Sequence, residues 1–295
     1  MKKPRKPAQP RIVIRSLVTM VAGLFTACST DSQPEINSNM NAEEIRSFDI
    51  SVPDGVLTDL KNRLAMTRLP DQIPGTGWDY GTNRDYLEEL IEYWKDEFDW
   101  RAQEEKLNEF DHFKTAIDGL DVHFIHERSP VDDAIPLLLT HGWPGSFVEF
   151  VDIIGPLTDP EAYGGDPSDA FHVVIPSLPG YGFSVKPEER GYNPERMADV
   201  LASLMERLGY ERYGAQGGDW GAIIGRVLAG NYGDRLIGLH SNFVLGGPPR
   251  GAGDPEAGVP IEELELRQER ARAFANESAY QTLQGTKPQS LGYGL

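Results

Sequence analysis

Cysteine is almost absent from this chain, and positive charge is scarce. Cys28 is the only cysteine in 295 residues, which excludes an internal disulfide framework, so stability must come from packing. The 28 Lys and Arg residues stand against 46 Asp and Glu residues, for a formal net charge of −18. Because phosphate binding needs clustered Lys and Arg, this balance argues against a nucleic-acid partner.

Long hydrophobic runs are also missing. The apolar stretch from Ser16 to Ala27 is shorter than the roughly 20 residues of a membrane-spanning helix, and it follows a basic opening without acidic residues. This pattern is typical of a signal peptide, here residues 1–27. Cys28 comes next, in a stretch that resembles the lipobox of bacterial lipoproteins. We expect export and membrane attachment through a lipidated Cys28. A cleaved signal that releases a periplasmic protein and a short uncleaved anchor are the alternatives.

A polar stretch, residues 28–45, has the composition of a flexible tether. Residues 46–113 then predict an N-terminal domain in which a short strand within FDISVPDG leads into a helix that ends by Pro70. A second helix is expected over residues 83–100. Its apolar positions form one stripe that we expect to pack in a core: Tyr86, Leu87, Leu90, Ile91 and Trp94.

Strand and helix patterns alternate over residues 114–250. A hairpin around Asp118-Gly119 comes first, and buried strands in IPLLLTHG, FHVVIPSLPG, RYGAQGG and LIGLHSNFV are then separated by helical patterns. Such alternation predicts an α/β fold with a mostly parallel sheet and helices on both faces. Ligand sites in such sheets lie at the carboxyl ends of the strands. Residues 251–295 open a different segment, with a polar helix over residues 261–276.

The stretch Gly217-Gly218-Asp219-Trp220-Gly221 lies between a strand and a helix. It fits a nucleophile elbow, whose middle residue is exposed on a strained turn and whose flanks must be small because strand and helix approach closely there. The elbow would place Asp219 at a helix N-terminus, where free N–H groups favour a carboxylate. The alternative is that Asp219 is only an N-cap, a position that Asp favours.

Two further loops follow strands in the same part of the chain. His141-Gly142-Trp143-Pro144-Gly145-Ser146 has the position of an oxyanion-hole loop, and a glycine-rich turn with a structural histidine is the alternative. Pro179-Gly180-Tyr181-Gly182-Phe183-Ser184 follows the next strand. This last loop is a weak signal by itself, but three loops in this order after three strands are a strong joint signal for one site.

The sequence resembles the epoxide hydrolases of the microsomal and juvenile-hormone type, within the α/β-hydrolase superfamily. FDISVPDGVLTDLKNRLAMTRLPD, HGWPGSFVEF, PSLPGYGFS, QGGDWG and TKPQSLGYGL carry the resemblance, which covers approximately residues 46 to 295. It implies that Asp219 is a nucleophile that forms an alkyl ester with an epoxide carbon. It also implies Tyr280 as the proton donor to the epoxide oxygen, and the backbone N–H groups of Trp143 and Trp220 as oxyanion donors. No cofactor and no metal are implied.

The family's second step needs a histidine base and a carboxylate after the lid. Of the six histidines, only His240 follows Asp219, and it lies in a strand where the family carries a structural histidine. We therefore expect the base and its acid to be absent from this chain, residues 251–295 to be the start of an incomplete lid, and the last strands to be missing. On this expectation the chain resembles a C-terminally truncated hydrolase that is inactive or limited to one turnover.

Two other functions remain open at this stage. A haloalkane dehalogenase also uses an Asp-Trp elbow, and a noncatalytic ligand-binding relative would need no base. Aromatic loop residues suggest a small hydrophobic substrate, although packing explains aromatic side chains equally well: Trp143, Phe147, Tyr181, Phe183 and Trp220. The sequence does not indicate an oligomeric state.

Overall fold

The computed structural model describes residues 44–244, 251, 253–254 and 256–294. The expected signal peptide, Cys28 and all of the expected tether except Glu44 and Ile45 lie outside this range. Among the described residues, no helix is both long enough and apolar enough to cross a membrane.

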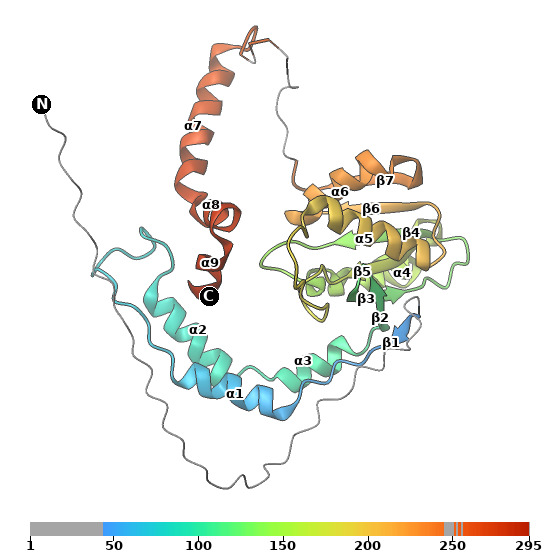
Figure 1. The fold of residues 1–295 in the computed structure, drawn as a ribbon, viewed down its shortest axis with the longest axis horizontal. Helices are drawn as coiled ribbons and strands as arrows, with labels where there is room; N and C mark the ends of the chain where they lie inside the picture. Colours follow the sequence, from blue (N-terminus) through green and yellow to red (C-terminus); the bar gives the residue numbers. More distant parts are fainter. Residues whose placement is uncertain (1–43, 245–250, 252, 255, 295) are drawn as a thin grey trace, which may run out of the picture. The chain divides into compact units, whose positions relative to one another are not determined.

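The chain alternates strands and helices, as expected (Figure 1). The strands are β1 (Arg46–Ser47), β2 (His112–Ile117), β3 (Leu120–Glu127), β4 (Ile135–Thr140), β5 (Phe171–Pro176), β6 (Tyr213–Gly217) and β7 (Leu236–Ser241). The α-helices are α1 (Asp54–Ala65), α2 (Arg84–Asp96), α3 (Trp100–Leu107), α4 (Val151–Thr158), α5 (Pro194–Arg207), α6 (Trp220–Asn231), α7 (Ile261–Glu277), α8 (Ala279–Thr286) and α9 (Pro288–Gly294).

The described strands form one sheet in the order β1-β2-β3-β5-β4-β6-β7. The expected hairpin is confirmed, since β2 and β3 pair antiparallel around Asp118-Gly119. The expectation of a mostly parallel sheet is wrong in detail. The sheet is mixed, because β1, β2, β3 and β5 pair antiparallel in succession, whereas β5, β4, β6 and β7 pair in parallel.

Helices cover both faces of the sheet, and alternate side chains along each strand supply the two cores. On one face, α5 and α6 pack on residues such as Phe124, Leu138 and Val174. On the other face, α4 and the short 3-10 helix η1 (Phe147–Phe150) pack on Ile125, Leu139 and Val173. The α/β architecture predicted from the sequence is therefore confirmed.

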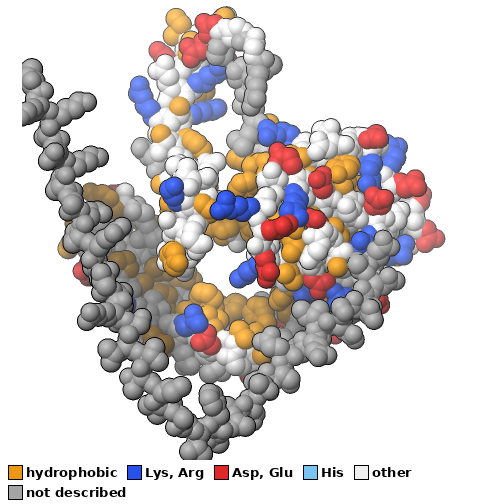
Figure 2. Space-filling model, viewed as in Figure 1, with side chains coloured by type: hydrophobic (Ala, Val, Ile, Leu, Met, Phe, Trp, Pro, Cys, Tyr) orange, Lys and Arg blue, Asp and Glu red, His pale blue; other side chains and the backbone are white. Residues whose placement is uncertain are grey.

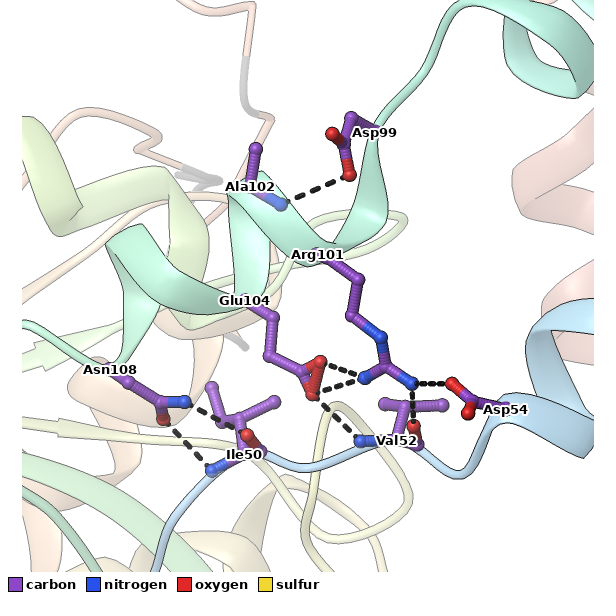
Figure 3. A network of polar contacts seen from close by, with 8 residues as sticks. All are labelled: Ile50, Val52, Asp54, Asp99, Arg101, Ala102, Glu104 and Asn108. Carbon is purple, nitrogen blue, oxygen red and sulfur yellow. Dashed lines mark hydrogen bonds and ion pairs between the residues drawn. The ribbon is translucent and has the colours of Figure 1, made fainter.

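The strand expected within FDISVPDG is nearly absent, because only Arg46 and Ser47 pair with β2. The extended segment that follows is bound by side chains of α3 and its C-cap instead (Figure 3). Asn108 accepts from the N–H of Ile50 at 2.9 Å and donates to its carbonyl oxygen at 2.8 Å. One helical turn earlier, Glu104 accepts from the N–H of Val52 at 2.8 Å, and Arg101 donates to the Val52 carbonyl oxygen at 2.7 Å.

The spacing explains why a helix can replace a strand here. Four residues advance about 6 Å along a helix, and two residues advance about 6.6 Å along an extended chain. Side chains one turn apart on α3 therefore meet alternate backbone groups of the segment. The result buries Ile50 in the core face that also holds Phe147 and Phe150.

The second expected helix is shorter than predicted, and its apolar stripe is not a core. The helix α2 ends at Asp96, and a separate helix, α3, begins at Trp100 after the N-cap Asp99, which accepts from the N–H of Ala102. No residue of α2 is buried, and the large hydrophobic side chains of Tyr86, Leu90 and Trp94 are exposed. Figure 2 shows hydrophobic side chains gathered over the N-terminal helices on the face drawn.

Candidate active site

The predicted elbow joins β6 to α6. Asp219 has φ 50° and ψ −121°, a region that non-glycine residues rarely adopt and that costs energy. It occupies the N-cap position of α6, but its side chain forms no capping hydrogen bond. The interpretation of Asp219 as a simple N-cap is therefore wrong, because its side chain caps no N–H of α6 and accepts from the N–H of Trp143 instead.

The loop after β4 meets this carboxylate. The strands β4 and β6 are parallel, and their last residues, Thr140 and Gly217, are register partners. The loop and the elbow therefore begin side by side. The N–H of Trp143 donates to Oδ1 of Asp219 at 2.8 Å, which is the geometry required of an oxyanion-hole donor.

The glycines of the two loops are required by close approach. A Cβ on Gly221 would lie 2.0 Å from the carbonyl oxygen of Thr140, and one on Gly217 would lie 2.4 Å from the backbone of Gly221. A Cβ on Gly142 would lie 2.4 Å from Cβ of Asp219. Any side chain at these positions would push apart the strand, the helix or the carboxylate.

Three other predicted loop residues have defined surroundings. A Cβ on Gly218 would lie 2.3 Å from the side-chain oxygen of Asn242. The Trp143–Pro144 peptide bond is cis. Trp220 is the first residue of α6, so its N–H is one of the four that a helix leaves without an intrahelical partner. Its role as the second oxyanion donor stays a prediction.

His141 is buried beneath the loop. Its Nε2 accepts from the N–H of Leu178 at 3.1 Å, which leaves Nδ1–H to donate to the carbonyl oxygen of Gly142 at 3.0 Å. Burial lowers the pKa of His141, and the Gly142 carbonyl opposes this effect. Both ring nitrogens are engaged, so His141 holds the loop rather than activating water.

In the described part of the chain, none of the six histidines forms a hydrogen bond with Asp219. His112, His123, His126 and His172 bond elsewhere in the fold, as does His141. His240 is exposed on β7, where Gln216 of β6 is its register partner. The structure thus brings the predicted nucleophile and oxyanion loop together, and it brings no histidine base to them.

A cavity of about 520 Å³ adjoins the elbow. Its wall includes both indoles of the predicted site and apolar side chains from the β5 loop, α5 and α9: Trp143, Trp220, Leu178, Tyr181, Met197 and Leu291. Tyr280 of α8 lies beside this wall, with its ring 5.8 Å from that of Trp143 and nearly parallel to it. The role of Tyr280 as proton donor stays a prediction, and its position beside the oxyanion loop is compatible with it.

The charge of Asp219 acts on two neighbours. Burial raises the pKa of Tyr181, and the Asp219 carboxylate raises it further, so this phenol stays protonated. Burial likewise raises the pKa of Glu149, with a further contribution from Asp219, while the backbone of Gly142 opposes both. Among the described residues, no group of His, Cys, Asp and Glu is arranged to bind a metal ion.

Sequence reasoning did not single out Leu178 and Met197 as cavity residues. Leu178 lies in the quoted PSLPGYGFS stretch, but nothing there separates a cavity-facing leucine from a core leucine. Met197 lies on the helical face of α5 that also supplies core residues, so only the tertiary arrangement could assign it.

Acidification is expected to destabilise the fold through its buried histidines. The pKa of His123 is lowered to about 3 and that of His126 to about 4, mainly because burial penalises the charged ring. In the unfolded chain a histidine has a pKa of about 6.5. As pH falls below that value, the unfolded state binds more protons than the folded state, so stability is lost. Between about pH 6.5 and pH 5, the two rings together should lower the free energy of unfolding by about 3 kcal/mol.

Urea unfolding at several pH values across this interval measures the effect. Most carboxylates stay ionised there, so the histidines dominate the slope. A free energy of unfolding that stays constant or rises as pH falls would show that the two rings are not held neutral.

Two family models match the chain. One, described as the alpha/beta hydrolase fold, matches residues 135–242, and the other, described as the epoxide hydrolase N terminus, matches residues 45–150. The first match and the geometry of the elbow define the chain as an α/β-hydrolase.

The relatives narrow this class. A protein of Stigmatella aurantiaca named as an epoxide hydrolase is 46% identical over 256 residues, which cover 85% of this chain and 56% of that protein. Epoxide hydrolase 1 of Sus scrofa is 39% identical over 272 residues, which cover 86% of this chain and 59% of that protein. The crystal structure of juvenile hormone epoxide hydrolase from the silkworm Bombyx mori superposes with a TM-score of 0.70 at 33% identity, covering 85% of this chain and 59% of that one. The chain belongs to the epoxide hydrolase family, and it spans less than two thirds of the length of these relatives.

Proposed function

We propose that this chain carries the ester-forming part of an epoxide hydrolase site. The observation that supports this proposal most directly is the carboxylate of Asp219, held on a strained elbow with Oδ1 bound by the N–H of Trp143. That bond occupies one oxygen, so Oδ2 is the oxygen left to attack. Two relatives named as epoxide hydrolases, at 46% and 39% identity, support the choice of substrate.

The first step is a displacement at carbon. Oδ2 of Asp219 bonds to one epoxide carbon, the bond from that carbon to the ring oxygen breaks, and the ring oxygen takes the electron pair. Tyr280 donates its phenolic proton to the resulting alkoxide, because a phenol is a stronger acid than the alcohol that forms. The product is a hydroxyalkyl ester of Asp219.

The second step is hydrolysis of that ester. Water attacks the ester carbonyl carbon of Asp219, and the N–H groups of Trp143 and Trp220 stabilise the negative oxygen, an effect worth roughly 3–4 kcal/mol per donor. The bond from that carbon to the ester oxygen then breaks, and the leaving alkoxide takes one proton of the attacking water. The other proton returns to the Tyr280 phenolate, so the diol leaves and Asp219 is ionised again. Because no histidine of the described chain reaches Asp219, we propose that the 295-residue chain forms the ester much faster than it hydrolyses it.

The apolar wall of the cavity supports a small hydrophobic epoxide as substrate. Incubation of the chain with styrene oxide, followed by intact-mass measurement and diol quantification, tests the proposal. A mass gain of one epoxide molecule per chain is expected. Bromide release from 1-bromobutane would indicate a haloalkane dehalogenase instead, and binding of styrene oxide without an adduct or a diol would indicate a noncatalytic relative. Rapid diol formation over many turnovers would contradict the proposed stop at the ester.

We further propose export and attachment to a bacterial membrane through a lipidated Cys28, on the strength of the basic and apolar opening of the sequence. Metabolic labelling with a clickable fatty acid, compared between the full chain and its Cys28→Ser variant, tests this. Equal labelling of both would refute it.

A further inference from the structure

Two buried histidines stack beneath the loops of the site. The rings of His112 on β2 and His123 on β3 lie 5.1 Å apart and nearly parallel. Nδ1 of His112 and Nε2 of His123 are 2.9 Å apart. At one end of the pair, Nε2 of His112 lies 2.7 Å from the carbonyl oxygen of Leu107, and at the other, Nδ1 of His123 lies 2.8 Å from Oγ of Ser177.

The chemistry of these four groups sets the direction of every hydrogen bond. The Leu107 carbonyl can only accept, so Nε2–H of His112 donates to it. A neutral ring then leaves Nδ1 of His112 as an acceptor for Nε2–H of His123. Nδ1 of His123 is in turn an acceptor for the hydroxyl of Ser177. With both rings neutral, every donor in this chain of hydrogen bonds faces an acceptor.

The environment favours neutral rings. Burial lowers the pKa of His123 to about 3, and the charges of His112 and Lys114 act in the same direction. Burial also lowers the pKa of His112, although the Leu107 carbonyl and the charges of Asp49 and Asp111 oppose it.

We call the hydrogen-bonded series from Leu107 through His112 and His123 to Ser177 the relay. One end of this relay lies in the N-terminal region. Leu107 is the last residue of α3, the helix whose side chains bind the extended segment at Ile50 and Val52 (Figure 3). The relay therefore starts from a backbone carbonyl that the polar network of α3 holds in place.

The other end lies in the loop that forms one wall of the cavity. Ser177 begins the loop after β5, and a Cβ on Gly182 would lie 2.5 Å from its Oγ. The hydroxyl of Ser184 closes the loop, because it accepts from the N–H of His123 at 2.9 Å and donates to the Ser177 carbonyl oxygen at 2.7 Å. Between these two serines lie Leu178 and Tyr181, which line the cavity.

The His123 ring also contacts the start of η1, the short helix that follows the oxyanion loop. Its edge-on neighbours include Phe147, at 5.1 Å, and Phe183, at 5.4 Å. Phe147 begins η1, directly after the loop that carries Trp143. One buried ring thus lies against the loop after β5 and against the helix that follows the oxyanion loop.

We propose that His123 and Ser177 are positioning residues, through which the N-terminal region fixes the loop Ser177–Ser184 and with it the cavity wall at Tyr181. The predicted effect of these two residues on ester formation rests on the proposed function. The state of the relay itself can be measured without any epoxide.

The first test uses the unmodified chain. Nitrogen-15 NMR of the histidine rings near neutral pH is expected to show both His112 and His123 as neutral Nε2–H tautomers. A charged ring, or an Nδ1–H tautomer at either residue, would overturn the relay.

The second test compares His123→Phe with His126→Phe, and adds Ser177→Ala. Both histidines lie on β3, with His123 buried and His126 half-buried, but His126 bonds to the hydroxyl of Tyr210, away from the loop. We expect His123→Phe and Ser177→Ala to increase amide hydrogen exchange over residues 178–184 by about tenfold or more. The rate constant of ester formation with saturating styrene oxide should fall by about tenfold, because the wall is misplaced. His126→Phe should change neither quantity, even where its loss of thermal stability equals that of His123→Phe.

Equal effects of the two phenylalanine variants would reduce His123 to a general packing residue and overturn the proposal, as would an unchanged loop in Ser177→Ala. If the unmodified chain forms no ester, the proposed function fails, and the exchange and NMR results still decide whether the relay positions the loop.

Discussion

Replacement of Asp219 by asparagine is expected to abolish the covalent adduct with styrene oxide, lowering its rate of formation by at least about a thousandfold. An amide is a poor nucleophile toward sp3 carbon, whereas its size and its tolerance of positive φ match those of aspartate. The carbonyl oxygen of the amide can still accept from the N–H of Trp143. The loss should therefore be chemical rather than structural, with an unfolding transition close to that of the parent chain.

Asp152→Asn is the matched control, since Asp152 is an exposed carboxylate in the first turn of α4. It should form the adduct at the parent rate. Peptide mapping of the modified parent chain should place the added mass on the peptide that contains Asp219. An adduct that persists in Asp219→Asn, or that maps to another residue, would remove Asp219 from the proposed mechanism.

Gly221→Ala is expected to destabilise the chain by about 3–5 kcal/mol or to prevent folding. The new Cβ would lie 2.0 Å from the Thr140 carbonyl oxygen and 3.1 Å from that of His141. Both are backbone atoms at the end of β4, so no side chain can move aside to make room. The helix α6 would have to withdraw from the sheet at the elbow.

Gly230→Ala is the control within the same helix. Gly230 has no atom within 4 Å of its would-be Cβ, and alanine is the better helix former, so a gain of about 0.5–1 kcal/mol is expected. Urea unfolding of the two variants measures the contrast. A loss below about 1 kcal/mol for Gly221→Ala would mean that helix and strand are not in the close contact described.

The features that sequence reasoning captured are those with local causes. A buried strand followed by small residues around Asp219 predicts an elbow, because strand and helix approach so closely there that side chains do not fit. The parallel strands then bring the loop of Trp143 to the same sheet edge, and the structure shows the two in contact. The Asp118-Gly119 hairpin was predictable for the same reason, since those residues accept the required backbone conformation.

The features that could not be predicted from the sequence depend on partners that lie far apart along the chain. The segment at Ile50 reads as a strand, but its backbone partners are side chains of α3. The stripe on α2 reads as a core face, because periodicity shows that a face is apolar without showing what covers it. The pairing of His112 with His123, and of His123 with Ser177, joins two strands to the loop after β5 and has no signature in any one of these segments.

The backbone conformation of Asp219 lowers the free energy of unfolding at the position of the proposed nucleophile. At φ 50° an aspartate is strained and a glycine is not. Asp219→Gly should therefore raise the free energy of unfolding, by about 1 kcal/mol after allowing for the greater freedom of glycine in the unfolded chain. The protein would then be more stable without its proposed nucleophile. Selection for thermal robustness alone would then favour loss of activity at this position, so screens for hardier variants should hold Asp219 fixed.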